Sequence, residues 1–286
     1  MSSQIEKKYI RVNGASIACY CAGGGNDVIV LLHGAGVDSA MLSWAEVIPL
    51  LSSQYQVIAP DLPGYGASSR ITGEYTLSFY TDMVKGIIEA LGGKPVILAG
   101  LSLGGGICLN MALTYPEIIK ILVPVDAWGL FDKLPWHRLT HWFVHSKLND
   151  NLYAWTNRYP SIVRFSLKYS LFGDKSKVSD ALVAEIHEAM LEPDADKPFI
   201  SFQRSEIAST GFTTDLFGRL EEISSPTLLV HGTLDKAVPI KGALIASKRI
   251  PDCEIYLMEG CKHWPQKERP EEFANALQSY IDRKLQ

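Results

Sequence analysis

Short runs of β-branched and other apolar residues alternate with amphipathic segments between residues 28 and 119 of this chain. A short unbroken apolar run is typical of a buried strand, whereas apolar positions that recur at helical spacing indicate a helix with one packed face. The strands that this pattern predicts are residues 28–32, 55–59, 95–99, 121–125, 227–230 and 254–257. The helices that it predicts are residues 41–51, 77–91, 103–114 and 270–285. Such alternation favours an α/β fold with a mostly parallel, twisted sheet flanked by helices.

The start of the chain has a different pattern. Two strand-like segments, 9–12 and 16–21, flank the dipeptide Asn13-Gly14, which is a strong signal for a tight hairpin turn. We therefore expect the sheet to begin with an antiparallel pair of strands.

A second change of pattern occurs at residues 130–219, where strand-like runs disappear and helical, aromatic-rich segments such as 136–148 and 181–191 replace them. This insertion lies between two strands that we expect to be parallel. Its helices would therefore cover the carboxyl ends of the strands, where open α/β sheets bind ligands. We expect a core domain made of residues 1–129 and 220–286, with residues 130–219 as a helical cap.

Composition narrows the class of partner. The chain has 286 residues and a formal net charge of -4, and it has no run of Lys or Arg that could follow a nucleic-acid backbone. We therefore expect a small-molecule substrate and no nucleic-acid partner. The chain shows neither an apolar segment of signal-peptide length near its start nor an apolar run of the roughly 20 residues that cross a bilayer. A cytoplasmic monomer or homodimer without a membrane partner is expected.

The five cysteines are odd in number and show no CxxC spacing. We expect them to be reduced thiols.

The first candidate for chemistry is Ser102, in the sequence Gly-Leu-Ser-Leu-Gly between a predicted strand and a predicted helix. A serine at such a sharp turn is the nucleophile elbow of many hydrolases. Gly100 and Gly104 fit this reading, because side chains at those positions would collide with nearby backbone. A serine hydroxyl is a weak nucleophile alone, so it requires a base and donors for the oxyanion.

The oxyanion donors are expected from two backbone N–H groups. Residues 33–36, His-Gly-Ala-Gly, follow the strand at 28–32, and their small side chains would let the N–H of Ala35 approach a reacting carbonyl. The N–H of Leu103 follows the nucleophile at the start of a helix and would be the second donor. His33 is expected to hydrogen-bond the loop rather than to act as the base.

The base is expected to be His263, which follows the last predicted strand, with Asp235 after the preceding strand to orient its ring. The order Ser102, Asp235, His263 is the order of the α/β-hydrolase arrangement. Asp126, at the end of the predicted strand 121–125, is a competing candidate for the acid, because some α/β hydrolases supply it from there. Its alternative role is to cap the turn into the insertion.

Together with the Asp-Leu-Pro-Gly-Tyr-Gly segment at 61–66, these motifs resemble the α/β-hydrolase superfamily over nearly the whole chain. Within it, the chain resembles capped serine esterases and also the hydrolases that cleave carbon–carbon bonds in ring-fission products of aromatic catabolism. Those carbon–carbon hydrolases usually have Asn directly before the nucleophile, where this chain has Leu101. Relatives that use an aspartate nucleophile are excluded by Ser102.

The resemblance favours a serine hydrolase that cleaves a small carboxylic ester through an acyl-enzyme. Two alternatives remain open: a carbon–carbon bond hydrolase and a small-molecule receptor that turns over slowly. No cofactor is expected, because the chain has neither a GxGxxG nor a P-loop. No metal is expected either, because the helix-spaced His137, His141 and His145 lack a further ligand in the sequence. The residues expected to bind substrate are Gly34, Leu101, Trp142, Phe165, Val238 and Trp264.

Overall fold

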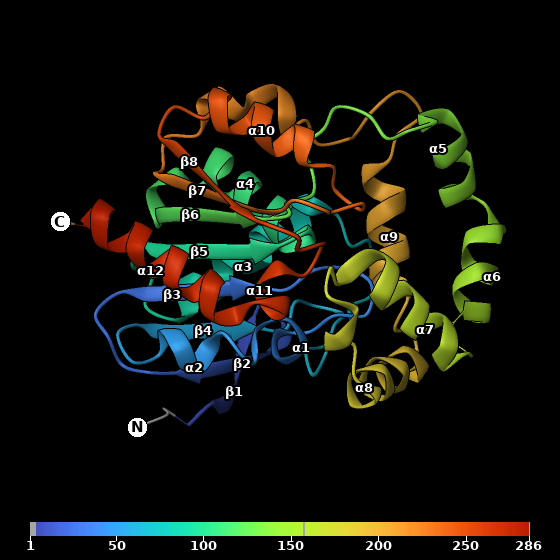
Figure 1. Ribbon diagram of the computed structural model, residues 1–286, viewed down its shortest axis with the longest axis horizontal. Helices are drawn as coiled ribbons and strands as arrows, with labels where there is room; N and C mark the ends of the chain where they lie inside the picture. Colours follow the sequence, from blue (N-terminus) through green and yellow to red (C-terminus); the bar gives the residue numbers. More distant parts are fainter. Residues whose placement is uncertain (1–3, 157, 286) are drawn as a thin grey trace.

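The structure is a computed structural model that describes residues 4–156 and 158–285. One eight-stranded sheet runs through it in the order β1-β2-β4-β3-β5-β6-β7-β8 (Figure 1). Its strands are β1 (Glu6–Val12), β2 (Ala15–Ala22), β3 (Val28–Leu32), β4 (Gln56–Pro60), β5 (Val96–Leu101), β6 (Ile119–Val125), β7 (Thr227–Gly232) and β8 (Cys253–Met258). The α/β-hydrolase fold expected from the sequence is confirmed.

The hairpin expected around Asn13-Gly14 is present. β1 pairs antiparallel with β2, β2 pairs antiparallel with β4, and all further neighbours from β4 to β8 are parallel. Asn13 and Gly14 both have positive φ, as a tight hairpin turn requires. The chain leaves β3 in one direction to form β4 and returns past β3 to form β5. This reversal of strand order is where open α/β sheets place their ligands.

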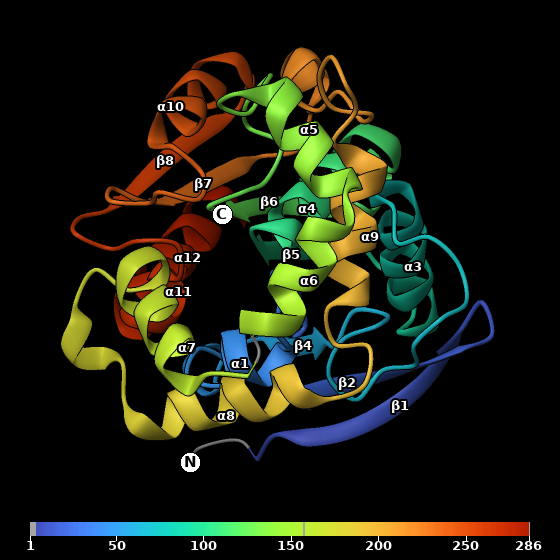
Figure 2. The same ribbon diagram turned by 90° about the vertical axis from the view of Figure 1, so that its right-hand side faces the viewer.

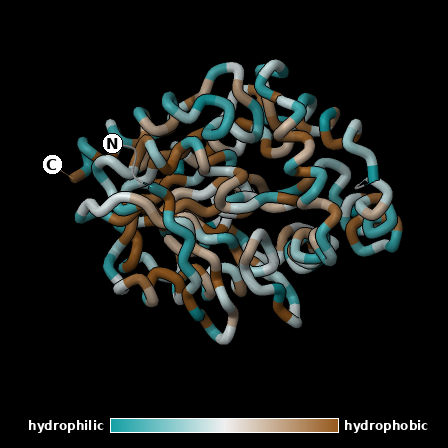
Figure 3. Tube along the Cα trace, turned by 90° about the horizontal axis from the view of Figure 1, so that it is seen from below, coloured by the Kyte–Doolittle hydropathy of each residue, from teal (hydrophilic) through white to brown (hydrophobic). Residues whose placement is uncertain are grey.

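Helices cover both faces of the sheet. On one face lie α3 (Leu77–Ala90), α4 (Leu103–Thr114) and α10 (Ile240–Arg249). On the other face lie α1 (Ala40–Trp44), α2 (Ile48–Leu51), α11 (Pro265–Glu268) and α12 (Pro270–Leu285). The central strands alternate between two apolar clusters, as consecutive side chains of a strand must when both faces are covered. Figure 3 shows the apolar segments gathered in the interior.

The chain between β6 and β7 forms a layer of helices beyond the carboxyl ends of the strands (Figures 1 and 2). Its elements are α5 (His137–His145), α6 (Lys147–Thr156), α7 (Pro160–Ser166), the π-helical η2 (Leu167–Leu171), η3 (Lys175–Lys177), α8 (Asp180–Leu191), α9 (Lys197–Glu206) and η4 (Phe217–Glu222). We propose that the elements from α5 to α9 form the cap, within the boundaries at 130 and 219 that the sequence predicts; η4 crosses the second boundary and packs Leu220 into the core.

Two predicted helices are divided in the structure. Residues 41–51 form α1 and α2, because Pro49 has no N–H to continue the helical hydrogen bonds and instead lies in the first turn of α2. Residues 136–148 are divided at Ser146, which has extended backbone and accepts a hydrogen bond from the Leu148 N–H at 3.2 Å. Helix α10 was not among the predicted elements. Among the described residues, no helix is long and apolar enough to cross a membrane.

Candidate active site

Ser102 lies at a sharp turn between β5 and α4. Its φ of 52° is unusual for a residue with a side chain, and its backbone is held by the N–H bond to Val125 O at 2.9 Å. A Cβ on Gly100 would come within 2.3 Å of Gly104 O, and a Cβ on Gly104 within 2.6 Å of Leu32 O. The turn therefore excludes side chains on both sides of the serine and presents the hydroxyl at the end of the central strand.

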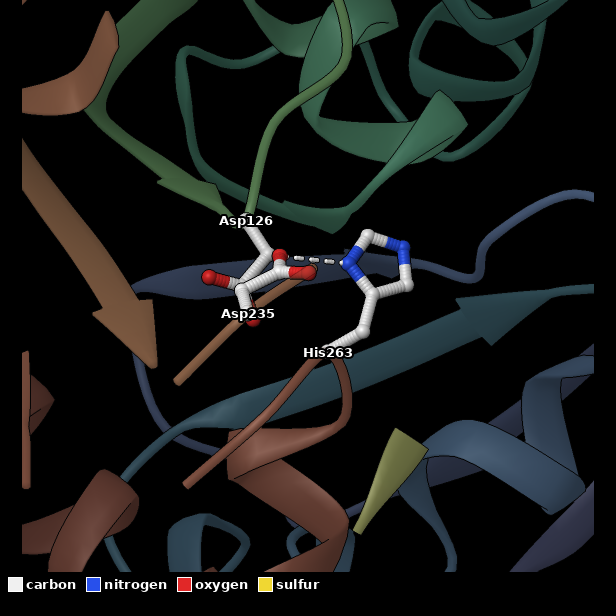
Figure 4. Close-up of side chains that lie close together, drawn as sticks. All are labelled: Asp126, Asp235 and His263. Atoms are coloured by element: carbon white, nitrogen blue, oxygen red, sulfur yellow. Dashed lines mark hydrogen bonds and ion pairs between the residues drawn. The ribbon is translucent and has the colours of Figure 1, made fainter. Parts of the chain in front are cut away.

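His263 and Asp235 meet at the ends of β7 and β8. The ring Nδ1 of His263 lies 2.7 Å from Asp235 Oδ2 (Figure 4). The other oxygen, Oδ1, accepts the N–H groups of Ala237 at 2.7 Å and Val238 at 3.1 Å. A carboxylate accepts hydrogen bonds, so Nδ1 donates, and in the neutral ring Nε2 then carries the lone pair. Ser102 and His263 both line the chamber described below.

Asp126, the competing candidate for the acid, lies behind this pair and is fully buried. Its Oδ1 accepts the Gly232 N–H at 2.9 Å and lies 3.2 Å from His231 Nδ1, while its Oδ2 has no hydrogen-bond partner among the described residues. Burial, followed by the charge of Asp235, raises the pKa of Asp126 well above its usual range. Of the two carboxyl groups, Asp235 is the one that accepts the hydrogen bond of the His263 ring. We propose Asp235 as the acid of the triad.

The loop after β3 passes directly beside Ser102. A Cβ on Gly34 would lie 3.5 Å from the Ser102 Cβ, which is van der Waals contact, and 3.0 Å from Asp38 Oδ2, so the loop runs directly against the serine side chain. Ala35 lines the chamber, as does Leu103, the first residue of α4, whose N–H lies in a turn without intrahelical acceptors. We propose that these two N–H groups bind the oxyanion.

Two side chains hold this loop in place. His33 binds Gly34 O through Nδ1 at 2.8 Å and accepts the Leu62 N–H through Nε2 at 2.9 Å, the structural role expected of it. Asp38, which sequence reasoning missed, accepts the Gly34 N–H at 2.7 Å and the Ser43 hydroxyl at 2.7 Å. Its position four residues after Gly34 gave no recognisable motif.

A chamber of about 620 Å³ lies between the cap and the triad. Most of its lining residues are apolar, and Ser102, His263, Gly34, Val238 and Trp264 lie at its core end. Phe199 and Phe202 of α9 and Leu167 of η2 are among the residues that close it from the cap. The chamber therefore encloses the proposed nucleophile and base within an apolar site of a size that suits a small molecule.

Three of the predicted substrate-binding residues lie elsewhere. Trp142 and Phe165 belong to the cap, but their side chains are 56% and 65% exposed and do not line the chamber. The reason is that α5 carries apolar residues on two sides, and Val144, not Trp142, is on the inner one. Leu101 is fully buried within the core beneath Ser102 and does not line the chamber.

Some aromatic residues of the cap line the chamber and others are exposed, and this difference predicts the outcome of a matched pair of cap variants. Phe199→Ala removes a half-buried ring from the chamber and should raise KM for a medium-chain p-nitrophenyl ester by about ten-fold, the order expected for loss of one buried aromatic contact. Trp142→Ala, which removes an exposed ring of similar size, should leave KM within about two-fold of the wild type. Equal effects of the two variants would contradict this assignment of the chamber wall.

Among the described residues, one group of acidic and imidazole side chains is close enough to share a metal ion: Asp126, Asp235 and His263, with ligand atoms within 4.8 Å of one another. Both oxygens of Asp235 and the Nδ1 of His263 are already used in the hydrogen bonds described above. Asp235 and His263 of this group are therefore better described as the acid and base of the proposed triad, with Asp126 buried behind them.

A mostly parallel sheet with a serine in a sharp strand-to-helix turn after a central strand is the arrangement of a class of enzymes, the hydrolases of the α/β type. A family model described as the alpha/beta hydrolase fold matches residues 27–270, and the chain belongs to this family.

The similarity to known enzymes extends over nearly the full length of the chain. It is 28% identical over 291 residues to a 2-hydroxy-6-oxo-6-(2'-aminophenyl)hexa-2,4-dienoic acid hydrolase of Metapseudomonas resinovorans, covering 99% of this chain and 95% of that protein. It is also 28% identical to a 2-hydroxy-6-oxo-2,4-heptadienoate hydrolase of Pseudomonas putida F1, covering 96% and 95%. A solved meta-cleavage product hydrolase from Pseudomonas fluorescens IP01 superposes with a TM-score of 0.81 at 25% identity, covering 96% and 97%.

The two sequence relatives are named as hydrolases of 2-hydroxy-6-oxo-dienoates, and the solved structure as a meta-cleavage product hydrolase. The expectation of a hydrolase is confirmed, and so is the resemblance to the carbon–carbon branch. The comparisons favour this branch over the carboxylic-ester reading preferred from the sequence.

Proposed function

We propose that this enzyme hydrolyses a carbon–carbon bond next to the carbonyl group of a small oxo compound. The observation that carries the proposal is similarity over almost the full chain to enzymes named for 2-hydroxy-6-oxo-dienoates. The hydrogen-bonded pair of Asp235 and His263 beside an elbow serine supplies chemistry suited to such a reaction.

In the proposed mechanism, the Ser102 hydroxyl attacks the carbonyl carbon of the ketonised substrate while His263 Nε2 takes its proton. Asp235 stabilises the imidazolium through Nδ1, and the N–H groups of Ala35 and Leu103 bind the oxyanion. When the carbon–carbon bond breaks, its electron pair stays on the departing carbon, which the imidazolium protonates. Water, activated by His263, then hydrolyses the acyl-enzyme and returns Ser102 to its free form.

Ester hydrolysis is the second candidate, and two observations favour it. The residue before the nucleophile is a buried leucine, so it offers no side-chain hydrogen bond to a polar dienone. Among the described residues that line the chamber, none is Lys or Arg, and the carboxylic side chains there are those of Asp196 and Glu206. A substrate carboxylate deep in the chamber would therefore find no cationic partner.

The proposed function is tested with 2-hydroxy-6-oxo-6-phenylhexa-2,4-dienoate, the compound for which a Burkholderia cepacia relative is named. Loss of its yellow dienolate absorbance and release of p-nitrophenol from a short ester are followed with one enzyme preparation. A larger kcat/KM for the dienoate supports the carbon–carbon reading, whereas a larger value for the ester supports the second candidate. Covalent capture of one equivalent without turnover would support the receptor alternative.

The charge of the chamber predicts a preference between two matched esters. p-Nitrophenyl valerate and the p-nitrophenyl monoester of glutaric acid have acyl groups of similar length, but only the second ends in a carboxylate. The enzyme should prefer the neutral ester by about ten-fold or more in kcat/KM, because burying an unpaired carboxylate near Asp196 and Glu206 is unfavourable. A preference for the charged ester would show that a cation reaches the bound acyl group.

A further inference from the structure

A second cavity, of about 510 Å³, lies behind the wall of the catalytic chamber. We call it the basic groove. Five of its lining residues carry a cationic group, Arg164, Lys168, Lys175, Lys236 and Lys262, although the surface that lines the groove is mostly apolar. No carboxylate is among the described residues that line it. This concentration of one charge stands out in a chain whose net charge is -4.

The groove and the chamber share one wall. Along α7 and η2, Ile162, Ser166 and Ser170 face the chamber, whereas Arg164 and Lys168 face the groove. This division follows from the helical period, which places the two sets on different sides of the same segment.

In the loops that carry Asp235 and His263, too, neighbouring residues face different cavities. Lys236 directly follows Asp235 and lines the groove, while Ala237 lines the chamber. Lys262 directly precedes His263 and lines the groove, while His263 lines the chamber. A ligand in the groove would therefore contact the cap and both loops that carry the acid and the base.

Lysines of the groove lie near one another: Lys236 and Lys175 both act on the charge of Lys262, and the charge of Glu268 opposes them in part. Lys262 is buried and donates to Lys168 O at 2.8 Å; its pKa is lowered, first by burial and then by the charges of Lys236 and Lys175. In the described structure, Arg164 has an ion pair, with Asp180 at 2.6 Å, and no ion pair involves the four lysines. Like charges so arranged repel one another unless an anion lies between them.

The groove also has an aromatic side. Phe165 and Tyr169 stack with ring centroids 5.6 Å apart, and both are more than half exposed. The Lys236 ammonium lies 4.1 Å from the centre of the Tyr169 ring. Phe165 was predicted to bind substrate in the chamber, but its ring instead offers an apolar surface beside the lysines.

We propose that the basic groove is a second binding site, for a phosphate-type anion that carries an apolar or aromatic group. The lysines bind the oxyanion by charge-assisted hydrogen bonds, and the Phe165–Tyr169 pair packs against the apolar group. The bound anion joins η2 to the loops of Asp235 and His263 and so stabilises the shared wall. Both a small phosphate ester and the headgroup of an anionic lipid have this chemistry.

The test is titration calorimetry of the full chain with phenyl phosphate, which requires no turnover and is thus independent of the proposed reaction. One saturable site is expected, with an affinity that decreases as salt is added. Lys168→Ala/Lys175→Ala should raise Kd by about ten-fold or more. Lys177→Ala is the matched control, because Lys177 lies in η3 with Lys175 but outside the groove, and it should leave Kd unchanged.

A parallel experiment distinguishes the two sources of the anion. Sedimentation with phosphatidylglycerol vesicles, against phosphatidylcholine vesicles, is measured for the same three proteins, with circular dichroism to confirm folding. Lysine-dependent binding to phosphatidylglycerol alone would identify a lipid headgroup, and lysine-dependent binding to phenyl phosphate a free ligand. If neither probe binds, or if both bind equally to the double variant and the wild type, the proposal is overturned. Should the double variant misfold, Lys175→Glu replaces it with the same criteria.

Discussion

Ser102→Ala is expected to lower kcat by several orders of magnitude, on the order of 10⁴-fold or more, for whichever substrate the enzyme turns over. The substitution removes the attacking oxygen and leaves the turn intact, since the backbone bonds of Ser102 to Val125, Gly106 and Trp128 do not use the side chain. The melting temperature should therefore change little. The measurement is steady-state kinetics at saturating substrate, together with a thermal unfolding curve.

A suitable control is Ser166→Ala, which removes a different hydroxyl that lines the same chamber. Its kcat should stay within about ten-fold of the wild type, because this serine lies at the end of α7 and not in the turn between β5 and α4. If the two variants lose similar activity, Ser102 is not the nucleophile.

The second large effect is expected at Asp235. Asp235→Asn should reduce kcat/KM by about 10³ to 10⁴-fold, because an amide can no longer hold the Nδ1–H tautomer of His263 or stabilise its positive charge. Asp126→Asn should cost about ten-fold or less, since the His263 ring is hydrogen-bonded to Asp235 and an amide oxygen at position 126 can still accept the Gly232 N–H.

The two variants are compared at several pH values in the same assay. A larger loss of kcat/KM for Asp126→Asn would identify Asp126, at the end of β6, as the acid of the triad. Equal losses would mean that both carboxyl groups act on His263, and the assignment of Asp235 alone would be wrong.

Local patterns predicted much of the core because each pattern has a local physical cause. The predicted helix 103–114 coincides with α4, which begins directly after the elbow serine. The role of Gly100 and Gly104 could be predicted from the sequence because a strained turn excludes side chains. The structure shows which backbone atoms a Cβ at either position would meet. The triad candidates follow strand ends, where a parallel sheet brings distant residues together.

The cap was less predictable because packing between its helices determines which side chains line the chamber. Helix α5 has Leu139 and Trp142 on one side and Thr140 and Val144 on another, and the sequence alone does not say which side faces the core. The structure places the second pair in the chamber wall. Aromatic character suggested Trp142 as a pocket residue, but its ring is exposed.

The basic groove could not be predicted for a different reason. Its lysines are spread over a cap segment and two core loops, from Lys168 to Lys262, and no stretch of the sequence is strongly basic. Only the fold brings Lys236 and Lys262 to the outer side of η2. Clusters of this kind depend on tertiary contacts, which local pattern does not encode.

The most direct test of the central claim is covalent labelling with a fluorophosphonate during turnover of the dienoate or ester substrate. Intact-protein and peptide mass spectrometry would identify the labelled residue while the remaining activity is measured in the same samples. We expect one label per chain, on Ser102, and a loss of activity that follows labelling in proportion. Full labelling of Ser102 with activity retained, or inactivation by a label at another residue, would contradict the assignment of this chamber as the active site.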